Sequence, residues 1–314
     1  MERLRVSDLA YIRLQAPDLD KAEEFLVDFG LVRAERTRDR LYMRGSDAAP
    51  FLHVTHRGEP RFLGTGWYAP GGDALKAATA LPSATGIETV DELGGGQRVR
   101  LTDPDGFKVE LVQGQHRVEP LAVEETLLNF GWAGLRRAGT EQRFPRRPSR
   151  VKRIAHYVLT TPQVVRAIAW YREALGLVCS DDIYVDDKAN IVGSFNRCDR
   201  GADYVDHHVF FCRTGPLAGL NHISFEVQDI DDVMLGHEHL VAKGYRHMWG
   251  VGRHYLGSQI FDYWCDPWGR VHEHWTDSDR LNHTEPPRLR TREEAFKVQW
   301  GPRAPAIFHS YATP

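Results

Sequence analysis

The sequence has few cysteines, no excess of charge of one sign and no long apolar run. Its four cysteines have no paired spacing, which indicates reduced thiols rather than a disulfide framework. A net charge of -3 at pH 7 provides no basic surface for nucleic acid. No segment is long and apolar enough for a membrane span, and the N-terminus lacks the apolar core of a secretion signal. We therefore expect a cytoplasmic protein that binds neither nucleic acid nor membrane.

What the sequence does contain is enough chain for more than one hydrophobic core. It has 314 residues, of which 42% are hydrophobic and 26% charged, as in ordinary globular proteins with two domains. The 15 histidines are the one oddity of the composition. They raise the question of which histidines share a site.

The chain contains an internal repeat. Residues 8–32 (DLAYIRLQAPDLDKAEEFLVDFGLV) and 153–178 (RIAHYVLTTPQVVRAIAWYREALGLV) each read as a short strand and then a helix that stops at a glycine. Residues 101–112 (LTDPDGFKVELV) and 264–275 (WCDPWGRVHEHW) share an Asp-Pro-x-Gly turn between two strands. The repeat predicts two similar halves, each divided into two units of one strand, one helix and several further strands.

The composition changes between and after these halves. Residues 116–150 are rich in arginine and contain several prolines, which favours a solvated linker over a binding patch. Residues 281–314 are rich in proline and charge and end in an apolar stretch. We therefore expect an N-terminal domain of residues 1–115, a C-terminal domain of residues 151–280, and a tail that packs onto the C-terminal domain.

Differences between the halves mark candidate site residues. Glu273 lies on the strand after the second turn, and a carboxylate that points inward is costly unless it is paired or holds a metal. Its counterpart in the first half is Glu110. His156 matches Tyr11, and His222 has no histidine counterpart. Only the second half therefore has two histidines and a glutamate on strands that could face one cavity.

Two imidazoles and one carboxylate suit a divalent transition metal. A set that leaves one face of the metal open is the arrangement of non-haem Fe(II) oxygenases, and zinc also accepts these ligands. The three residues lie far apart in the sequence, so on the residues alone the alternative of satisfied core histidines stays open.

With these residues, the segment 252–275 (GRHYLGSQIFDYWCDPWGRVHEHW) resembles the type I extradiol ring-cleavage dioxygenases of the vicinal oxygen chelate superfamily, such as the 2,3-dihydroxybiphenyl and catechol 2,3-dioxygenases. The resemblance covers roughly residues 8–280 and is most specific from His254 to Glu273. It implies an α+β fold of two domains, each of two βαβββ units, the first without metal and the second catalytic. It also implies Fe(II), with Mn(II) as an alternative, a catechol and O2 as substrates, and a homo-oligomer.

The resemblance also implies roles for single residues. The family's metal ligands fall on His156, His222 and Glu273. Its acid–base histidine falls on His207. The neighbouring His208 is the competitor for this role, because strand alternation lets only one of the two face the metal.

Two further positions carry active-site hydrogen bonds in the family, and they fall on His254 and Tyr263. The biphenyl-type enzymes have an Asn-Asp pair where this chain has Leu256-Gly257, which disfavours the biphenyl group. The Trp-Gly-Pro sequence at 300–302 resembles enzymes for single-ring catechols or trihydroxytoluene. We therefore expect extradiol cleavage of such a substituted catechol, in the catabolism of aromatic compounds.

Two alternatives stay open. The first is another enzyme on the same scaffold, either a 2-oxo-acid dioxygenase of the hydroxyphenylpyruvate type or a glyoxalase-type lyase or isomerase. A glyoxalase-type enzyme draws ligands from both halves and would need a ligand where Tyr11 and Gly64–Trp67 stand. The second alternative is a non-catalytic binder of small molecules that kept the fold, which predicts no bound metal.

Overall fold

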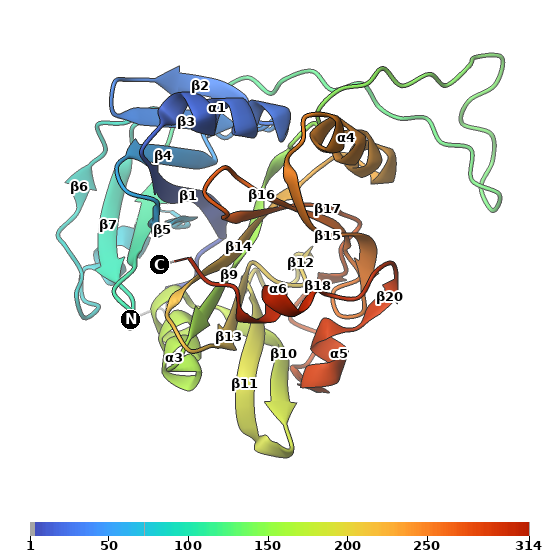
Figure 1. The fold of residues 1–314 in the computed structure, drawn as a ribbon. Coiled ribbons are helices and arrows are strands. Elements are labelled where there is room, and N and C mark those ends of the chain that lie inside the picture. The colour runs from blue at the N-terminus through green and yellow to red at the C-terminus, as the bar shows by residue number, and fades with distance from the viewer. Residues whose placement is uncertain (1–3, 72, 314) are drawn as a thin grey trace.

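A computed structural model describes residues 4–71 and 73–313, which form two large sheets and one small one (Figure 1). The first sheet is built from residues of the N-terminal half. Helix α1 (Leu19–Asp28) follows its first strand, and α2 (Ala74–Ala78) follows its fifth. Its strands are β1 (Asp8–Ala16), β2 (Val32–Arg36), β3 (Arg40–Arg44), β4 (His53–Arg57), β5 (Arg61–Tyr68), β6 (Glu88–Thr89), β7 (Gln97–Thr102) and β8 (Lys108–Gln113). Their order β2-β3-β4-β1-β5-β8-β7-β6 joins two βαβββ units through the β1–β5 pair.

The second sheet repeats this plan and adds one strand at each edge. Helices α3 (Val164–Leu175) and α4 (Ile230–Ala242) follow the first strands of its two units. Its strands are β9 (Arg153–Thr161), β10 (Val178–Val185), β11 (Asp187–Arg197), β13 (Phe210–Thr214), β14 (Gly219–Glu226), β15 (Arg246–His254), β16 (Ile260–Cys265), β17 (Val271–Thr276), β19 (Arg288–Thr291) and β20 (Val298–Trp300). Their order is β19-β10-β11-β13-β9-β14-β17-β16-β15-β20. The predicted α+β fold of paired βαβββ units is therefore confirmed.

The strand register gives the two halves equivalent positions. In the first half, one residue of β5 is paired with both Tyr11 and Glu110. In the second half, one residue of β14 is paired with both His156 and Glu273. The matches made from the sequence thus correspond to the same places in the two sheets.

The Asp-Pro-x-Gly turns connect the halves. In the first turn, Asp103 Oδ2 accepts a hydrogen bond from Tyr171 Oη at 2.9 Å. After the second turn, Arg270 pairs with Asp266 at 2.6 Å and donates to the Gln15 carbonyl at 2.5 Å. Each turn therefore contributes a contact that holds its own half against the other.

The segments outside the two repeats behave differently from each other. Residues 116–150 contain no helix or strand. The ends of this segment are tied to the two halves, where Val118 N–H donates to the Ala48 carbonyl and Arg147 donates to Asp232, and the stretch between them extends away from the sheets (Figure 1). The C-terminal tail instead pairs β19 with β10 and β20 with β15, and it contains the short helices α5 (Arg292–Phe296) and α6 (Ala306–Ser310). The small sheet pairs β12 (Val205–Asp206) with β18 (Arg280–Leu281). In the described part of the chain, no helix is long and apolar enough to cross a membrane.

Candidate metal centre and active site

Three buried side chains from neighbouring strands converge on one point. His156 lies on β9, His222 on β14 and Glu273 on β17, and these strands are adjacent in the sheet. One ligand atom of each residue lies within 4.8 Å of the other two. The distances to Glu273 Oε2 are 3.0 Å from His156 Nε2 and 3.6 Å from His222 Nε2. The structure therefore brings together the three residues for which a ligand role was predicted.

The Glu273 carboxylate has an unusual environment. Its side chain is fully buried, and neither of its oxygens takes part in a hydrogen bond of regular geometry. Burial by itself raises the pKa of Glu273, but the imidazoles of His156, His254 and His222 outweigh it and hold that pKa well below its usual range. An ionised and buried carboxylate needs a compensating charge. The donor set of two imidazoles and this carboxylate fits a divalent transition metal.

The equivalent glutamate of the first half is satisfied by the protein itself. Glu110 accepts hydrogen bonds from Tyr11 at 2.5 Å and from Arg13 at 3.0 Å, and Arg98 lies 3.6 Å away. A Cβ at Gly66 would lie 2.2 Å from the Tyr11 ring, so this glycine leaves the space that the ring fills. In the first half, side chains of the protein therefore fill the position that is equivalent to the His-His-Glu cluster.

The orientation of His222 depends on its neighbour in the sequence. Asn221 Nδ2 donates to the Tyr311 carbonyl at 2.7 Å, which turns Asn221 Oδ1 toward His222 Nδ1 at 2.8 Å. Burial lowers the pKa of His222 to about 3, so its ring is neutral. A proton on Nδ1, shared with Asn221, leaves the Nε2 lone pair toward Glu273, as in metal-ligating histidines. Sequence reasoning missed this role of Asn221.

His254 and Tyr263 lie beside the three-residue cluster. His254 Nε2 is 2.9 Å from Tyr263 Oη and 3.6 Å from Glu273 Oε1. The Tyr263 ring centroid is 5.1 Å from that of His222. Burial and the neighbouring Glu273 charge raise the pKa of Tyr263 well above its usual value, so its hydroxyl stays protonated and available as a donor.

The adjacent histidines His207 and His208 have different surroundings. His208 lies on the wall of the cavity described next, with its ring centroid 4.3 Å from that of His156. His207 lies behind it, where its Nε2 is 2.6 Å from Asp181 Oδ2 and its Nδ1 is 3.1 Å from His208 Nδ1. The geometry therefore favours His208 over His207 as the residue that meets a substrate. Asp181 was not singled out from the sequence.

A cavity lies over the cluster, and its remaining wall is largely apolar. Phe195 and Phe211 stack there with ring centroids 3.9 Å apart. The C-terminal tail closes one side with Phe296 and Phe308, and the Phe308 ring lies 5.0 Å from that of Tyr263. A polar end beside an apolar slot suits an aromatic ring that carries oxygen atoms at one edge.

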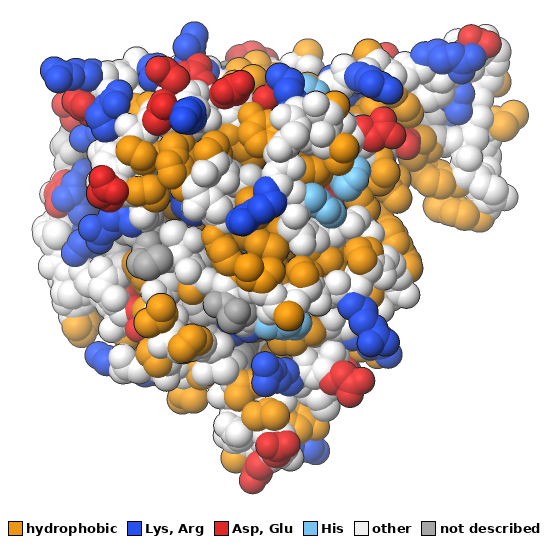
Figure 2. All heavy atoms as spheres, viewed as in Figure 1, with side chains coloured by type: hydrophobic (Ala, Val, Ile, Leu, Met, Phe, Trp, Pro, Cys, Tyr) orange, Lys and Arg blue, Asp and Glu red, His pale blue; other side chains and the backbone are white. Residues whose placement is uncertain are grey.

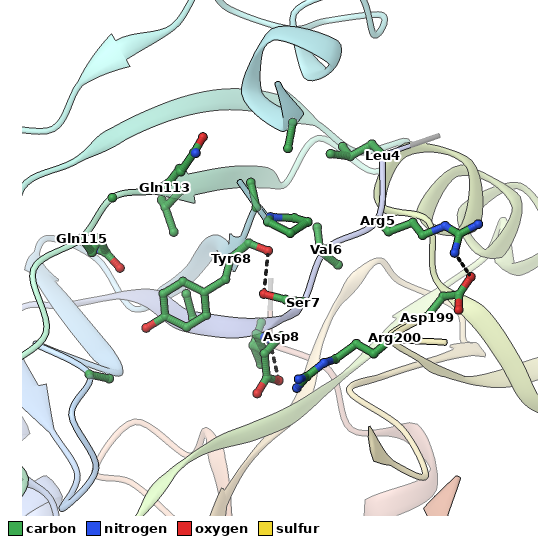
Figure 3. A pocket seen from close by; sticks show the side chains of 18 of the residues that line it. Leu4, Arg5, Val6, Ser7, Asp8, Tyr68, Gln113, Gln115, Asp199 and Arg200 are labelled. Atoms are coloured by element: carbon green, nitrogen blue, oxygen red, sulfur yellow. Dashed lines mark hydrogen bonds and ion pairs between the residues drawn. The ribbon is translucent and has the colours of Figure 1, made fainter. Parts of the chain in front are cut away.

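A hollow much larger than this cavity lies elsewhere. It is a groove of about 1550 Å³ lined by both halves (Figure 3). Its polar contacts include an ion pair of Arg5 with Asp199 at 3.1 Å and a hydrogen bond from Ser7 to the Tyr68 carbonyl at 3.3 Å. The three cluster residues do not line it, so its size gives no reason to place the chemistry there.

A second group with metal-ligand chemistry lies on α4, β15 and β16. Asp262 is fully buried and accepts from His237 at 3.0 Å, His247 at 2.7 Å and Trp264 at 2.5 Å. These donors satisfy the Asp262 carboxylate. The group therefore differs from Glu273, whose oxygens have no such donors.

Comparison with known proteins agrees with this geometry. Residues 153–270 match the family described as the Glyoxalase/Bleomycin resistance protein/Dioxygenase superfamily. The chain is 31% identical over 309 residues to Metapyrocatechase 2 of Cupriavidus necator, covering 98% of this chain and 92% of the relative. It is 29% identical over 116 residues to biphenyl-2,3-diol 1,2-dioxygenase of Pseudomonas sp. (strain KKS102), covering 36% of this chain and 37% of that one.

Solved structures share the fold. Homoprotocatechuate 2,3-dioxygenase from Arthrobacter globiformis superposes with a TM-score of 0.81 at 21% identity, covering 98% of this chain and 92% of that one. The Mn(II)-bound glyoxalase from Novosphingobium aromaticivorans gives a TM-score of 0.79 at 22% identity, covering 99% and 97%. Paired βαβββ units with a buried His-His-Glu cluster define the class of the vicinal oxygen chelate proteins. Within that class, the chain belongs to the extradiol ring-cleavage dioxygenases, the family of Metapyrocatechase 2. Membership implies a catalytic metal ion.

Proposed function

We propose that the chain opens the aromatic ring of a catechol with O2, next to the two hydroxyl-bearing carbons, at Fe(II) held by His156, His222 and Glu273. The observation that carries this proposal is the fully buried Glu273 carboxylate, which lies beside two imidazoles without a regular hydrogen bond. The names of the two curated relatives, a metapyrocatechase and a biphenyl-2,3-diol dioxygenase, support a catechol and O2 as substrates. Both oxygen atoms of O2 end in the ring-opened product.

The metal and the protein have separate tasks in this reaction. A bound divalent metal acts as a Lewis acid that lowers the pKa of a catechol hydroxyl and holds both reactants side by side. Asn221 keeps the His222 ring turned toward this position through its 2.8 Å contact with Nδ1. The apolar wall with Phe195 and Phe211 excludes water and positions the ring.

We assign proton transfer to His208, the role that the resemblance implied for His207. His208 faces the cavity next to His156. Burial lowers the pKa of His208 well below the usual value, whereas the nearby Glu273 charge raises it, so the free ring is neutral. This neutral ring would accept a catechol hydroxyl proton, made more acidic by metal coordination, and return it to a product oxygen. His207 is the positioning residue, because it contacts His208 at 3.1 Å while Asp181 holds its other ring nitrogen at 2.6 Å.

Tyr263 and His254 supply hydrogen bonds to substrate oxygens. Both line the cavity from strands β15 and β16, and their side chains are 2.9 Å apart. The protonated Tyr263 hydroxyl is a donor for oxygen on which negative charge develops. His254 orients that hydroxyl and adds a second donor or acceptor at the same edge of the substrate.

The first half disfavours a glyoxalase-type reaction that takes ligands from both halves. There, Tyr11 occupies the position of His156, and Arg13 already pairs with Glu110. Among the described residues, a set of two imidazoles and a carboxylate without a regular hydrogen bond occurs in the second half alone. Its two imidazoles and one carboxylate accept both Fe(II) and Mn(II), and we propose Fe(II), with a single-ring catechol or trihydroxytoluene as substrate.

One experiment tests this function directly. The protein is stripped of metal, loaded anaerobically with Fe(II), Mn(II) or Zn(II), and exposed to air with a panel of catechols while O2 uptake and visible absorbance are followed. We expect O2 uptake and a yellow ring-opened product with Fe(II). A protein that holds one Fe(II) per chain and consumes no O2 with any catechol would contradict the proposal.

We also propose a homo-oligomer that acts in the cytoplasm. The projecting segment 116–150 exposes Trp132 by 85% and Leu135 by 81%, and Phe130 stacks on Trp132 at 5.4 Å. Hydrophobic side chains are visible on this projection at the upper right of Figure 2. Exposed apolar side chains of this size favour a protein contact. Light scattering during size-exclusion chromatography measures the mass, and a monomer at all concentrations would contradict the proposal.

A further inference from the structure

One buried cation lies in the catalytic cavity without an acidic partner. Arg213 on β13 lines the cavity and is only 6% exposed. Its guanidinium donates to the His309 carbonyl and lies 5.0 Å from the centroid of the Phe296 ring. Across residues 4–71 and 73–313, no carboxylate comes within 4.0 Å of it. Burial and, to a lesser extent, the charge of Arg292 lower the pKa of Arg213 to about 10, so Arg213 is still a cation at neutral pH.

Other buried arginines of this protein are compensated. Arg13 pairs with Glu92 at 2.6 Å, and Arg270 pairs with Asp266 at 2.6 Å. Arg197 has no ion pair, but its guanidinium donates to the carbonyls of Cys179, Asn282 and Glu285 and to Ser180 Oγ, whereas Arg213 donates to the His309 carbonyl alone among the described residues. An uncompensated buried charge is destabilising. Arg213 therefore has fewer acceptors than these other buried arginines, and a bound anion would supply the counter-charge that it lacks.

The position of Arg213 relates it to the metal cluster. Strands β13 and β9 are parallel neighbours in which Phe211 is paired with Val158 and Arg213 with Thr160. Phe211 and Val158 line the cavity. Because alternate residues of a strand face the same side, Arg213 continues the face that carries His156 and Val158. Its charged group lies beyond the apolar wall, at the end of the cavity that the tail covers.

We propose that Arg213 binds a carboxylate carried by the catechol, with the two hydroxyls at the cluster end of the cavity and the substituent at the tail end. This inference rests on the function proposed above and names the substrate class. A guanidinium matches a carboxylate with two parallel N–H donors. The apolar wall between the two ends contacts the ring, so each part of such a substrate meets groups of matching chemistry. Arg292 of α5 adds positive charge near Arg213.

The experiment compares each acid with its uncharged amide of the same shape. Fe(II)-loaded wild-type protein is assayed with 3,4-dihydroxyphenylacetate and its amide, and with the 2,3-dihydroxyphenyl isomers of both. We expect kcat/KM for the acid to exceed that for the amide by about 30-fold or more in one isomer series. This is the factor by which binding weakens in other complexes when one partner of a buried charge pair is removed. Anaerobic titration followed by tryptophan fluorescence measures the same preference as a ratio of Kd values.

Variants then assign the preference to Arg213. Arg213→Gln should bring the acid-to-amide ratio to about one, and Arg213→Lys, which keeps the charge without the two-pronged geometry, should lie between. The matched control is Arg288→Gln, on the tail strand β19, where Arg288 pairs with the half-buried Glu285 at 3.0 Å. This control should keep the wild-type ratio.

Two results overturn the proposal. One is a wild-type protein that does not prefer the acid in either isomer series. The other is an Arg213→Gln variant in which kcat/KM falls by the same factor for the acid and for the amide. Arg213 would then only hold the tail, through its hydrogen bond to the His309 carbonyl. If the metal-loaded wild type cleaves no catechol, the proposed function fails instead, and the anaerobic Kd ratios still decide whether Arg213 selects a carboxylate.

Discussion

Replacing the two adjacent histidines one at a time separates acid–base catalysis from positioning. His208→Phe keeps an aromatic ring against His156 and Phe195, at 4.3 Å and 4.8 Å in the wild type, but removes the only proton acceptor of the pair that lines the cavity. A positioned general acid–base residue contributes about 10²- to 10⁴-fold to a rate. We therefore expect kcat to fall by that factor, with metal content unchanged because His208 is outside the ligand set.

His207→Phe should have a smaller effect of a different kind. It removes the contact with His208 at 3.1 Å. Asp181 keeps its other partner, Arg290, whose Nε lies 3.3 Å from Asp181 Oδ1 in the wild type. We expect a loss of about tenfold, typical of a group that orients a catalytic residue, and Asp181→Asn should match it because both act through His208. Single-turnover kinetics of anaerobic enzyme–catechol complexes mixed with O2, together with metal analysis, measure these effects. A His207→Phe variant that is slower than His208→Phe would refute the assignment, as would loss of metal from either variant.

Three further predictions concern the site and its support. Tyr263→Phe removes the donor hydroxyl but keeps the ring, so kcat should fall about 10²-fold at unchanged metal content; an unchanged kcat would exclude Tyr263 from the chemistry. The pKa of Asp103 is raised by burial from 3.8 to about 6, so its stabilising contribution is present below pH 3.8 and is lost as the pH rises through 6. The stability advantage of Asp103→Asn over wild type, from urea unfolding, should therefore grow by about 2–3 kcal/mol between pH 4 and pH 7, and a constant difference would contradict this. Chelation should lower the Tm of the wild type, since a metal at 100 times its Kd stabilises by about 2.7 kcal/mol, and no shift would mean that no metal is bound.

The repeat made much of the fold and of the cluster predictable from the sequence. The Asp-Pro-x-Gly turns set the register of the strands that follow them, and this register makes Glu110 and Glu273 equivalent positions. Comparison of the halves then singled out His156 against Tyr11. These predictions hold because the position of each strand and the hairpin that each turn closes follow from local sequence, and the repeat relates the two halves.

The roles of His207 and His208 could not be separated in the same way. The alternation rule applies to residues within a strand. The structure places both histidines in the irregular segment between β12 and β13, where no regular ladder determines which side chain faces inward. The contact of His207 with Asp181 determines instead which of the two histidines faces the cavity. That contact joins residues 26 positions apart in the sequence.

The sequence also did not predict in detail where the C-terminal tail packs. Strands β19 and β20 join opposite edges of the second sheet, and edge pairing uses backbone groups that any sequence provides. The apolar end of the tail indicated packing onto the C-terminal half. It did not indicate that Phe308 would reach the cavity, nor that the Tyr311 carbonyl would orient the partner of His222.

The metal content of two matched variants tests the central claim most directly. Glu273→Gln and Glu110→Gln change equivalent positions of the two sheets, and each keeps the size of the side chain. After anaerobic loading with Fe(II) and removal of free metal, we expect one metal ion per chain in the wild type and in Glu110→Gln, and almost none in Glu273→Gln. Full metal content in Glu273→Gln, or its loss in Glu110→Gln alone, would contradict the placement of the metal in the second half.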